Sequence, residues 1–239
     1  MPISVSQLSA KLEKPITSFG LITDIHYANH DDRWNYERTF LRRHRNSLQL
    51  VRQASLYWRN TTYPIAFIVQ LGDLIDGYCK SKGSSNEDLT LILEQFKEIR
   101  EICPIYHVWG NHEFYNFTRQ QLLNGPLQSF DTSQIAPAHY GTWKISEHVR
   151  MIVLDTYELS LLGIENDNPT YQEAMGLLKK YNKNENINDP TGLEGIQQRF
   201  IRLNGGLKQK QLKWLKIQLE NAELANEKVI ILGETISTN

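Results

Sequence analysis

Three short polar clusters in the first half of the sequence contain side chains that commonly bind metal ions. They are Asp24-Ile25-His26, Gly72-Asp73-Leu74-Ile75-Asp76 and Gly110-Asn111-His112-Glu113. A carboxylate and an imidazole two residues apart can converge on one ion, a carboxylate can bridge two ions, and an amide supplies a neutral carbonyl oxygen. Such side chains suit a dinuclear site. Two ions about 3.5–4 Å apart generate a hydroxide at neutral pH and stabilise both oxygens of an in-line phosphoryl displacement.

Each cluster directly follows a segment that we expect to be a buried β-strand. These segments are short apolar runs at residues 17–23, 65–71 and 104–109. Between them, residues 34–58 and 87–100 repeat apolar side chains at helical spacing. This β-α-β-α-β order predicts parallel strands, whose carboxyl ends customarily hold the ligand. The three clusters should therefore meet at one edge of the sheet.

The second half of the chain has a less regular pattern. The sequence predicts a strand at 149–154, paired with one near 140–146, and a surface excursion over 160–206 with a short helix near 171–181. An amphipathic helix containing Leu212, Leu215 and Leu219 follows, and then a strand at 228–232. We find no internal repeat and no domain linker.

The composition is typical of one soluble globular domain and excludes a disordered or collagen-like polymer. Of 239 residues, 40% are hydrophobic and 22% are charged, and the formal net charge is -1. So small a charge gives no global attraction to nucleic acid or to anionic membranes, so we expect neither as a partner. Cys79 and Cys103 favour two reduced thiols in a cytoplasmic protein, and no apolar run approaches the roughly 18 residues of a membrane span.

The three clusters, each after an expected strand, resemble the motifs of the calcineurin-like metallophosphoesterase superfamily. Those motifs are Asp-x-His, Gly-Asp-x-x-Asp and Gly-Asn-His-Glu, and the match covers residues 24–113. A narrower likeness to the manganese-dependent ADP-ribose/CDP-alcohol diphosphatases extends from about Ser18 to Gly233. It is carried by LITDIHYA, QLGDLIDGY, WGNHEFYNF, LDTYELSLLG and NGGLKQKQLKWL. The resemblance implies an α/β fold, a two-sheet β-sandwich flanked by helices.

The resemblance also implies an activity. The family hydrolyses the diphosphate bond of ADP-ribose and of CDP-alcohols such as CDP-choline, with two divalent ions, Mn²⁺ by preference and Mg²⁺ as an alternative. The expected partner is thus a small nucleotide-diphosphate substrate. Two alternatives stay open: a non-catalytic form that still binds nucleotides, and a sister metallophosphoesterase such as a cyclic-nucleotide phosphodiesterase.

Individual roles follow from the same resemblance. Asp24 and His26 would bind the first ion, Asp73 would bridge both ions, and Asn111 would bind the second ion. His112 would stabilise the transferring phosphoryl group or protonate the leaving oxygen, a task suited to imidazole near neutral pH. Candidate substrate-binding residues are Tyr36, Arg43 and Tyr115.

The resemblance ends near the last residues of the sequence. The superfamily has three further histidine ligands after the Asn-His motif, whereas the last histidine here is His148. The sequence KVIILG matches the family through Gly233, and Glu234 stands where a ligand histidine is expected. We interpret this as a truncated or alternatively spliced product or a gene-model error, with reduced activity. The expected organisation is an N-terminal segment at 1–16, an incomplete metallophosphoesterase domain at 17–233 that lacks its C-terminal strands, and a divergent tail at 234–239.

Overall fold

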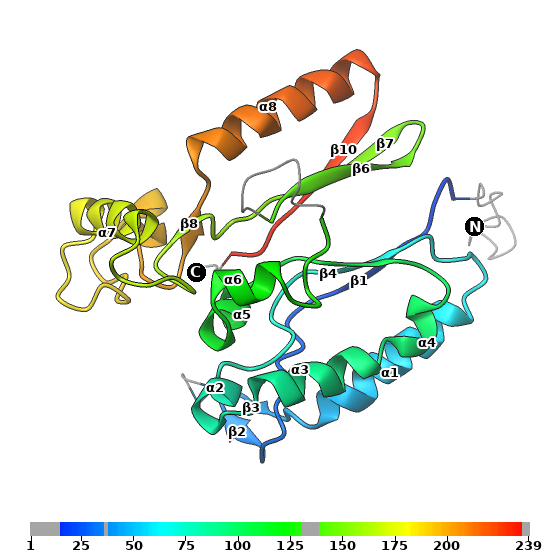
Figure 1. The fold of residues 1–239 in the computed structure, drawn as a ribbon, viewed down its shortest axis with the longest axis horizontal. Coiled ribbons are helices and arrows are strands. Elements are labelled where there is room, and N and C mark those ends of the chain that lie inside the picture. The colour runs from blue at the N-terminus through cyan, green and yellow to red at the C-terminus, as the bar shows by residue number, and fades with distance from the viewer. Residues whose placement is uncertain (1–14, 36–37, 131–138, 236–239) are drawn as a thin grey trace, which may run out of the picture.

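The computed structural model describes residues 15–35, 38–130 and 139–235 of the chain. Two three-stranded sheets lie face to face, and helices cover the outer face of each sheet (Figure 1). One sheet has the strand order β1-β4-β5 and the other has the order β10-β7-β6.

The first sheet is parallel and is formed by the three strands predicted to precede the polar clusters. They are β1 (Gly20–Ile22), β4 (Ile68–Gln70) and β5 (Ile105–His107), each shorter than the apolar run that contains it. Since the strands are parallel, their carboxyl ends meet at one edge of the sheet. The loops that leave this edge contain the first two clusters, and the third cluster forms the start of helix α5 (Asn111–Asn116).

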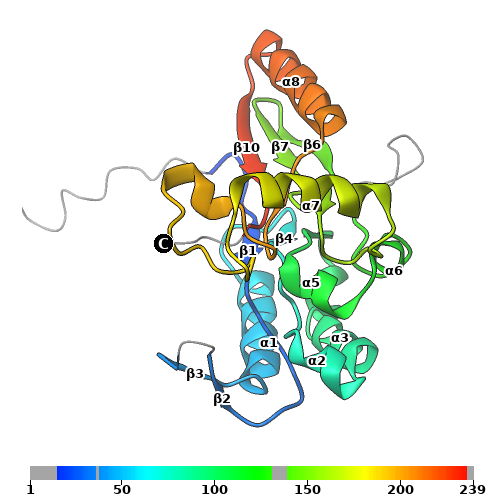
Figure 2. The same cartoon turned by 90° about the vertical axis from the view of Figure 1, so that its left-hand side faces the viewer.

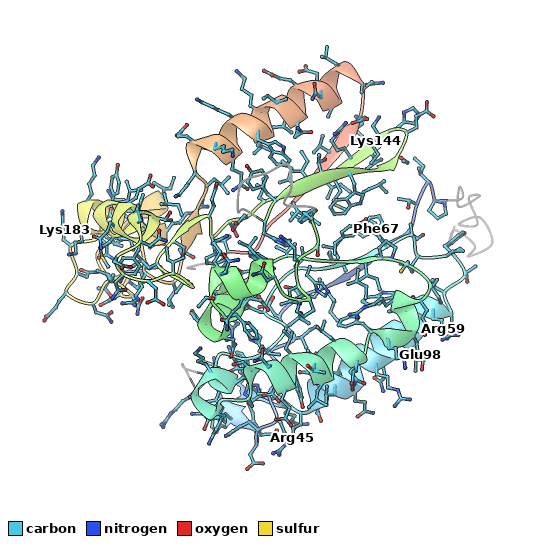
Figure 3. All side chains as sticks on the ribbon, viewed as in Figure 1. Arg45, Arg59, Phe67, Glu98, Lys144 and Lys183 are labelled. Carbon is cyan, nitrogen blue, oxygen red and sulfur yellow. The ribbon has the colours of Figure 1, made fainter. Side chains whose placement is uncertain are left out.

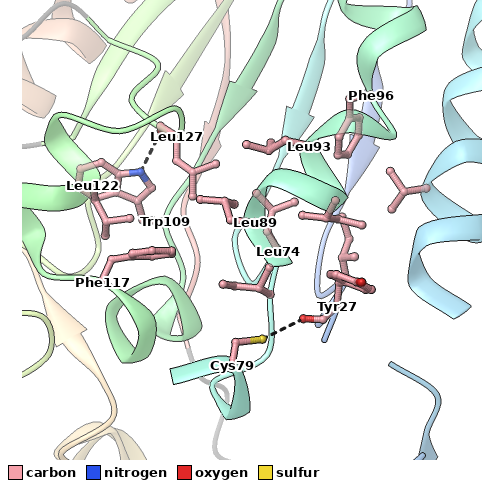
Figure 4. Packing of buried hydrophobic residues seen from close by; sticks show 14 of the residues in the cluster. Tyr27, Leu74, Cys79, Leu89, Leu93, Phe96, Trp109, Phe117, Leu122 and Leu127 are labelled. Atoms are coloured by element: carbon pink, nitrogen blue, oxygen red, sulfur yellow. Dashed lines mark hydrogen bonds between the residues drawn. The ribbon is translucent and has the colours of Figure 1, made fainter. Parts of the chain in front are cut away.

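Helices α1 (Asn46–Arg59), α3 (Ser85–Glu94) and α4 (Lys97–Arg100) cover the outer face of this sheet, and α2 (Tyr78–Lys82) packs against α3 and α5 (Figure 1). Their apolar side chains belong to the larger core cluster, in which Leu74 and Phe96 are fully buried (Figure 4). Full burial of one such side chain stabilises the fold by about 1.5–3 kcal/mol. The core therefore provides a rigid base for the loops at the strand ends.

The second sheet matches the predicted elements closely. β6 (Gly141–Ser146) and β7 (Val149–Val153) are antiparallel, and β10 (Lys228–Leu232) lies parallel to β7. Helix α8 (Gln209–Leu224) covers the outer side of this sheet (Figure 1). A second apolar cluster includes Phe67, Val69 and Met151. Figure 3 shows Phe67 of this cluster between the two sheets.

The remaining elements lie at the carboxyl end of the first sheet and beyond it. Helices α5 (Asn111–Asn116) and α6 (Arg119–Leu123) follow β5 directly. The excursion after β7 contains β8 (Leu159–Ser160), α7 (Pro169–Tyr181), the 3₁₀ helix η2 (Gly195–Arg199) and β9 (Gly205–Gly206). Helix α7 lies across one end of the sandwich (Figure 2) and packs on a small apolar cluster of its own. No helix in the described ranges has both the length and the apolar character needed to cross a bilayer.

The helix predicted over 34–58 is wrong in nearly its first half. Helix α1 begins only at Asn46, and an antiparallel pair, β2 (Arg33–Trp34) and β3 (Leu41–Arg42), precedes it. The side chain of Asn35 accepts hydrogen bonds from the backbone N–H groups of Thr39 (2.7 Å) and Phe40 (3.1 Å). Such a bond offers the backbone an alternative to the helical ladder. The helix predicted over 87–100 is also interrupted, because α3 ends at Glu94 and α4 begins at Lys97.

Candidate metal centre

The loops that follow β1 and β4 are held together by backbone hydrogen bonds. The N–H groups of Asp24, His26 and Tyr27 donate to the carbonyl oxygens of Gly72, Asp73 and Leu74 at 3.3, 2.9 and 3.0 Å. Asp24, His26 and Asp73 have φ angles of 53°, 46° and 59°. This left-handed region is uncommon for residues with a Cβ atom and persists only where the surroundings enforce it, as at functional sites.

Two glycines allow the loops after β4 and β5 to touch. Gly72 has a φ of +93°, and a Cβ atom there would lie 2.7 Å from the backbone nitrogen of Gly110. A Cβ atom on Gly110 would collide with the Oδ1 atom of Asp73. Any larger residue at either position would therefore push Asp73 away from the cluster on α5.

Glu113 joins the second and third clusters. Its buried carboxylate accepts hydrogen bonds from the backbone N–H groups of Asp73 (2.8 Å), Leu74 (2.8 Å) and Gly110 (2.7 Å). Burial raises the pKa of Glu113, and these three donors oppose that rise. Glu113 belongs to a cluster identified in the sequence, but no role was predicted for it. A sequence signal for this role was available: an acid at the third residue of a helix can accept a hydrogen bond from the backbone N–H of the residue that precedes the helix.

His26, Asp73 and His112 form the centre of the site. The Nε2 atom of His26 lies 3.4 Å from Asp24 Oδ1 and 3.7 Å from Asp73 Oδ2. The rings of His26 and His112 are in edge contact, with centroids 4.3 Å apart. Potential ligand atoms of His26, Asp73 and His112 all lie within 4.8 Å of one another. Each of the three sequence clusters thus contributes one side chain to the centre of the site.

Asn111 is oriented by a neighbour on the same helix. Its side-chain Nδ2 donates a hydrogen bond of 2.7 Å to the hydroxyl of Tyr115. This bond leaves the amide carbonyl oxygen of Asn111 available as a ligand. Tyr115, selected from the sequence as a candidate for substrate binding, therefore also orients a candidate metal ligand.

His112 is held in one tautomer. Its Nδ1 atom accepts a hydrogen bond of 2.8 Å from the backbone N–H of Gly77, so the neutral ring has its proton on Nε2. The backbone N–H of His112 donates to Asp73 Oδ1 at 2.9 Å. Burial, assisted by the neighbouring His26, lowers the pKa of His112 to about 3. The side chain is therefore a neutral hydrogen-bond donor at physiological pH.

All five residues predicted to bind metal or to act in catalysis line one cavity of about 460 Å³. The lining residues are Thr23, Asp24, His26, Arg42, Leu71, Asp73, Asn111, His112, Gly233, Glu234 and Thr235. The cavity thus opens at the carboxyl ends of β1 and β4 and is closed on another side by the residues that follow β10.

The structure gives the arginines different positions from those expected. Arg42 lines the cavity, and its Nη1 atom lies 3.2 Å from Asp76 Oδ2. Arg43 lines an adjoining hollow, where its side chain is 67% exposed and lies 3.9 Å from Asp32. Arg42 was not predicted as a site residue because the sequence pattern placed both arginines on a helix. Tyr36 lies outside the described residues.

The site collects acidic groups that a cation would stabilise. Burial, together with the charges of Glu113 and Glu234, raises the pKa of Asp73 to about 9. The Nδ1 atom of His26 is buried and has no hydrogen-bond partner within the described residues. Carboxylates, one imidazole and one amide oxygen form a donor set suited to Mn²⁺ or Mg²⁺. The residues present therefore fit a divalent metal ion.

The chain matches a family model described as calcineurin-like phosphoesterase over residues 17–235. The chain therefore belongs to the calcineurin-like phosphoesterase family, and the predicted fold class is confirmed. A solved dimetal phosphatase from Danio rerio superposes with a TM-score of 0.84 at 34% identity, covering 92% of this chain and 70% of that one.

Within that family, the chain is similar to curated enzymes named manganese-dependent ADP-ribose/CDP-alcohol diphosphatase. The Mus musculus enzyme is 37% identical over 234 residues, which cover 94% of this chain and 68% of that enzyme. The Homo sapiens enzyme is 35% identical over 226 residues, covering 90% of this chain and 65% of that enzyme. The chain thus spans about two thirds of the length of these relatives.

Proposed function

We propose that this chain hydrolyses the diphosphate bond of ADP-ribose and CDP-alcohols with two divalent metal ions, Mn²⁺ by preference. The observation that supports this most strongly is the convergence of Asp24, His26, Asp73, Asn111 and His112 on one cavity. The names of the relatives support the substrates and the metal. The similar solved structure from Danio rerio is that of a dimetal phosphatase, which supports the use of two ions.

The chain would divide the metal ligands between its loops. Asp24 and His26 would hold one ion, Asn111 would hold the other, and Asp73 would contact both. Bound ions supply a hydroxide at neutral pH and offset charge on the phosphoryl oxygens. Because Glu113 and the two glycines hold these loops together, the ligands are organised before an ion binds.

His112 and Arg42 would act on the substrate. His112 would donate its Nε2–H to a phosphoryl oxygen or to the leaving oxygen, with Gly77 and Asp73 holding its ring and backbone in place. Arg42 presents a guanidinium group, whose planar set of donors matches phosphate oxygens, and its contact with Asp76 limits its motion.

Chromatography of reaction products tests the proposal. The purified chain is incubated with ADP-ribose, CDP-choline or a cyclic nucleotide, in Mn²⁺ or in EDTA. We expect Mn²⁺-dependent release of AMP and CMP, lost in Asp73→Asn and retained in the exposed control Asp167→Asn. A folded chain that binds nucleotide but releases neither product would contradict the proposal, as would turnover of the cyclic nucleotide alone.

A further inference from the structure

Glu234 lies in the same cavity as the candidate ligands although it comes from a different part of the fold. It follows β10, and its backbone carbonyl accepts a hydrogen bond from the hydroxyl of Thr156. Its side chain lines the cavity with Asp73 and Asn111. The carboxylate thus reaches the site from the second sheet, opposite the loops of the first sheet.

One oxygen of Glu234 lacks any partner among the residues that the structure describes. The Oε2 atom is buried and makes no hydrogen bond to them. An unsatisfied buried polar atom costs about 1–3 kcal/mol, and more if it is charged. Because Oε2 makes no hydrogen bond to the described residues, this oxygen is available to a metal ion.

The surroundings of Glu234 favour a cation. Burial raises the pKa of Glu234 to about 7, and the charges of Glu113 and Asp24 contribute to this rise. The hydroxyl of Tyr157 and the backbone N–H of Asn111 oppose it. A divalent ion among these acids would offset their repulsion and provide a partner for Oε2.

We propose that Glu234 is a metal ligand, which binds the second ion together with Asp73 and Asn111. The inference rests on the metal site of the proposed function and adds a ligand to it. Since the family resemblance places a histidine at this position, the carboxylate replaces an imidazole with an anionic oxygen. Oxygen ligands suit Mn²⁺ and Mg²⁺, whereas imidazole suits Zn²⁺. Glu234 should therefore shift the metal preference of this chain toward Mn²⁺.

Glu234→Gln separates a ligand from a structural residue, because glutamine keeps the size and the carbonyl oxygen but removes the charge. We compare wild type, Glu234→Gln, Glu234→His and the exposed control Glu223→Gln by calorimetric titration with Mn²⁺ and with Zn²⁺. Loss of an outer partner of a ligand typically weakens metal binding by about 10–100-fold, and loss of a ligand should cost at least as much.

We expect Glu234→Gln to lose one of two bound Mn²⁺ ions or to bind it at least about tenfold more weakly. Glu234→His should regain binding with a higher ratio of Zn²⁺ to Mn²⁺ affinity than wild type, and the control should match wild type. The melting temperature of each metal-free variant checks that it is folded. Full Mn²⁺ binding by folded Glu234→Gln would overturn the inference.

Asp73→Asn, measured in parallel, distinguishes this failure from a failure of the proposed function. If Asp73→Asn loses both ions while Glu234→Gln keeps both, the metal site stands and only the role of Glu234 is wrong. If wild type binds no Mn²⁺, the metal site itself is wrong, and the inference fails with it.

Discussion

The carboxylate of Glu113 accepts a hydrogen bond of 2.8 Å from the backbone N–H of Asp73, although 40 positions separate the two residues. Through this bond, the helix that follows β5 holds the loop that follows β4. The bond is one of the contacts that hold Asp73 in its left-handed backbone conformation, with φ at 59°. Glu113, for which the sequence predicted no role, thus positions Asp73, which is predicted to contact both metal ions.

Replacement of Glu113 should therefore affect stability as well as metal binding. Glutamine has one carbonyl oxygen and a donor group, so Glu113→Gln leaves at least one of three backbone N–H groups unsatisfied. We expect the free energy of unfolding, measured in urea, to fall by about 1–3 kcal/mol. Glu98→Gln is a control, because its exposed ion pair with Arg59 contributes at most about 1 kcal/mol. Equal stability of the two variants would contradict the role given to Glu113.

Asp73 should stabilise the metal-bound form at the expense of the metal-free form. Burial and the neighbouring acids raise the pKa of Asp73 to about 9, so this side chain is costly to ionise in the metal-free fold, and metal-free Asp73→Asn should melt no lower than wild type. An ion at a hundredfold excess over its dissociation constant stabilises a protein by about 2.7 kcal/mol. Melting scans with and without Mn²⁺ should show this gain in wild type and in Asp167→Asn but not in Asp73→Asn. A gain of equal size in Asp73→Asn would exclude Asp73 as a ligand.

Two buried histidines should make the fold sensitive to acid. His139 Nε2 lies 2.6 Å from the carbonyl oxygen of His107, and its ring stacks on Trp109. Burial lowers the pKa of His107 to about 3 and that of His139 to about 4. Both rings are neutral in the folded protein, whereas the unfolded chain binds protons below about pH 6.5.

Stability should therefore be fully present above about pH 6.5 and fall as the pH drops toward about 4. Each histidine contributes a slope of up to about 1.4 kcal/mol per pH unit. Urea unfolding between about pH 4.5 and pH 7.5 checks the slope, and His139→Gln should reduce it while exposed His148→Gln should not. If His139→Gln does not fold, NMR titration of wild type measures the pKa of each buried histidine directly. Protonation of either buried ring above about pH 6 would contradict this assignment.

The adjacent arginines should differ in their effects on substrate binding. Arg42 lines the metal cavity, while Arg43 is largely exposed beside it. Arg42→Ala should raise KM for ADP-ribose by at least about tenfold, because a charge-assisted hydrogen bond contributes about 1.5–3 kcal/mol. Arg43→Ala should change KM by less than about threefold, as expected of an exposed charge. Steady-state kinetics in Mn²⁺ compares them, and a larger effect of Arg43→Ala would reverse the assignment.

The sequence predicted those parts of the fold that depend on local patterns. Strand β10 was predicted at 228–232, where it lies, because a short apolar run follows an amphipathic helix. The first part of the helix predicted over 34–58 is wrong because Leu41 fits a helical period by chance, while the side-chain bonds of Asn35 favour a turn.

The residues of the candidate site also differ in whether a local sequence pattern indicates them. Asp24, His26, Asp73, Asn111 and His112 were predicted because each lies beside a strand end, where topology alone brings residues together. Arg42 was not predicted as a site residue, and Glu234 was noted only as the residue that stands where the family has a ligand histidine. Their positions depend on the β2–β3 pair and on the placement of β10 in the second sheet, and neither arrangement has a local signal.

Anomalous diffraction from crystals soaked in Mn²⁺ tests the dinuclear site most directly. We predict two peaks about 3.5–4 Å apart, both in contact with the carboxylate of Asp73. Asp24 and His26 should bind the ion at one peak, and Asn111 should bind the ion at the other. A single peak, or a pair of peaks that leaves Asp73 without a metal contact, would contradict the dinuclear site.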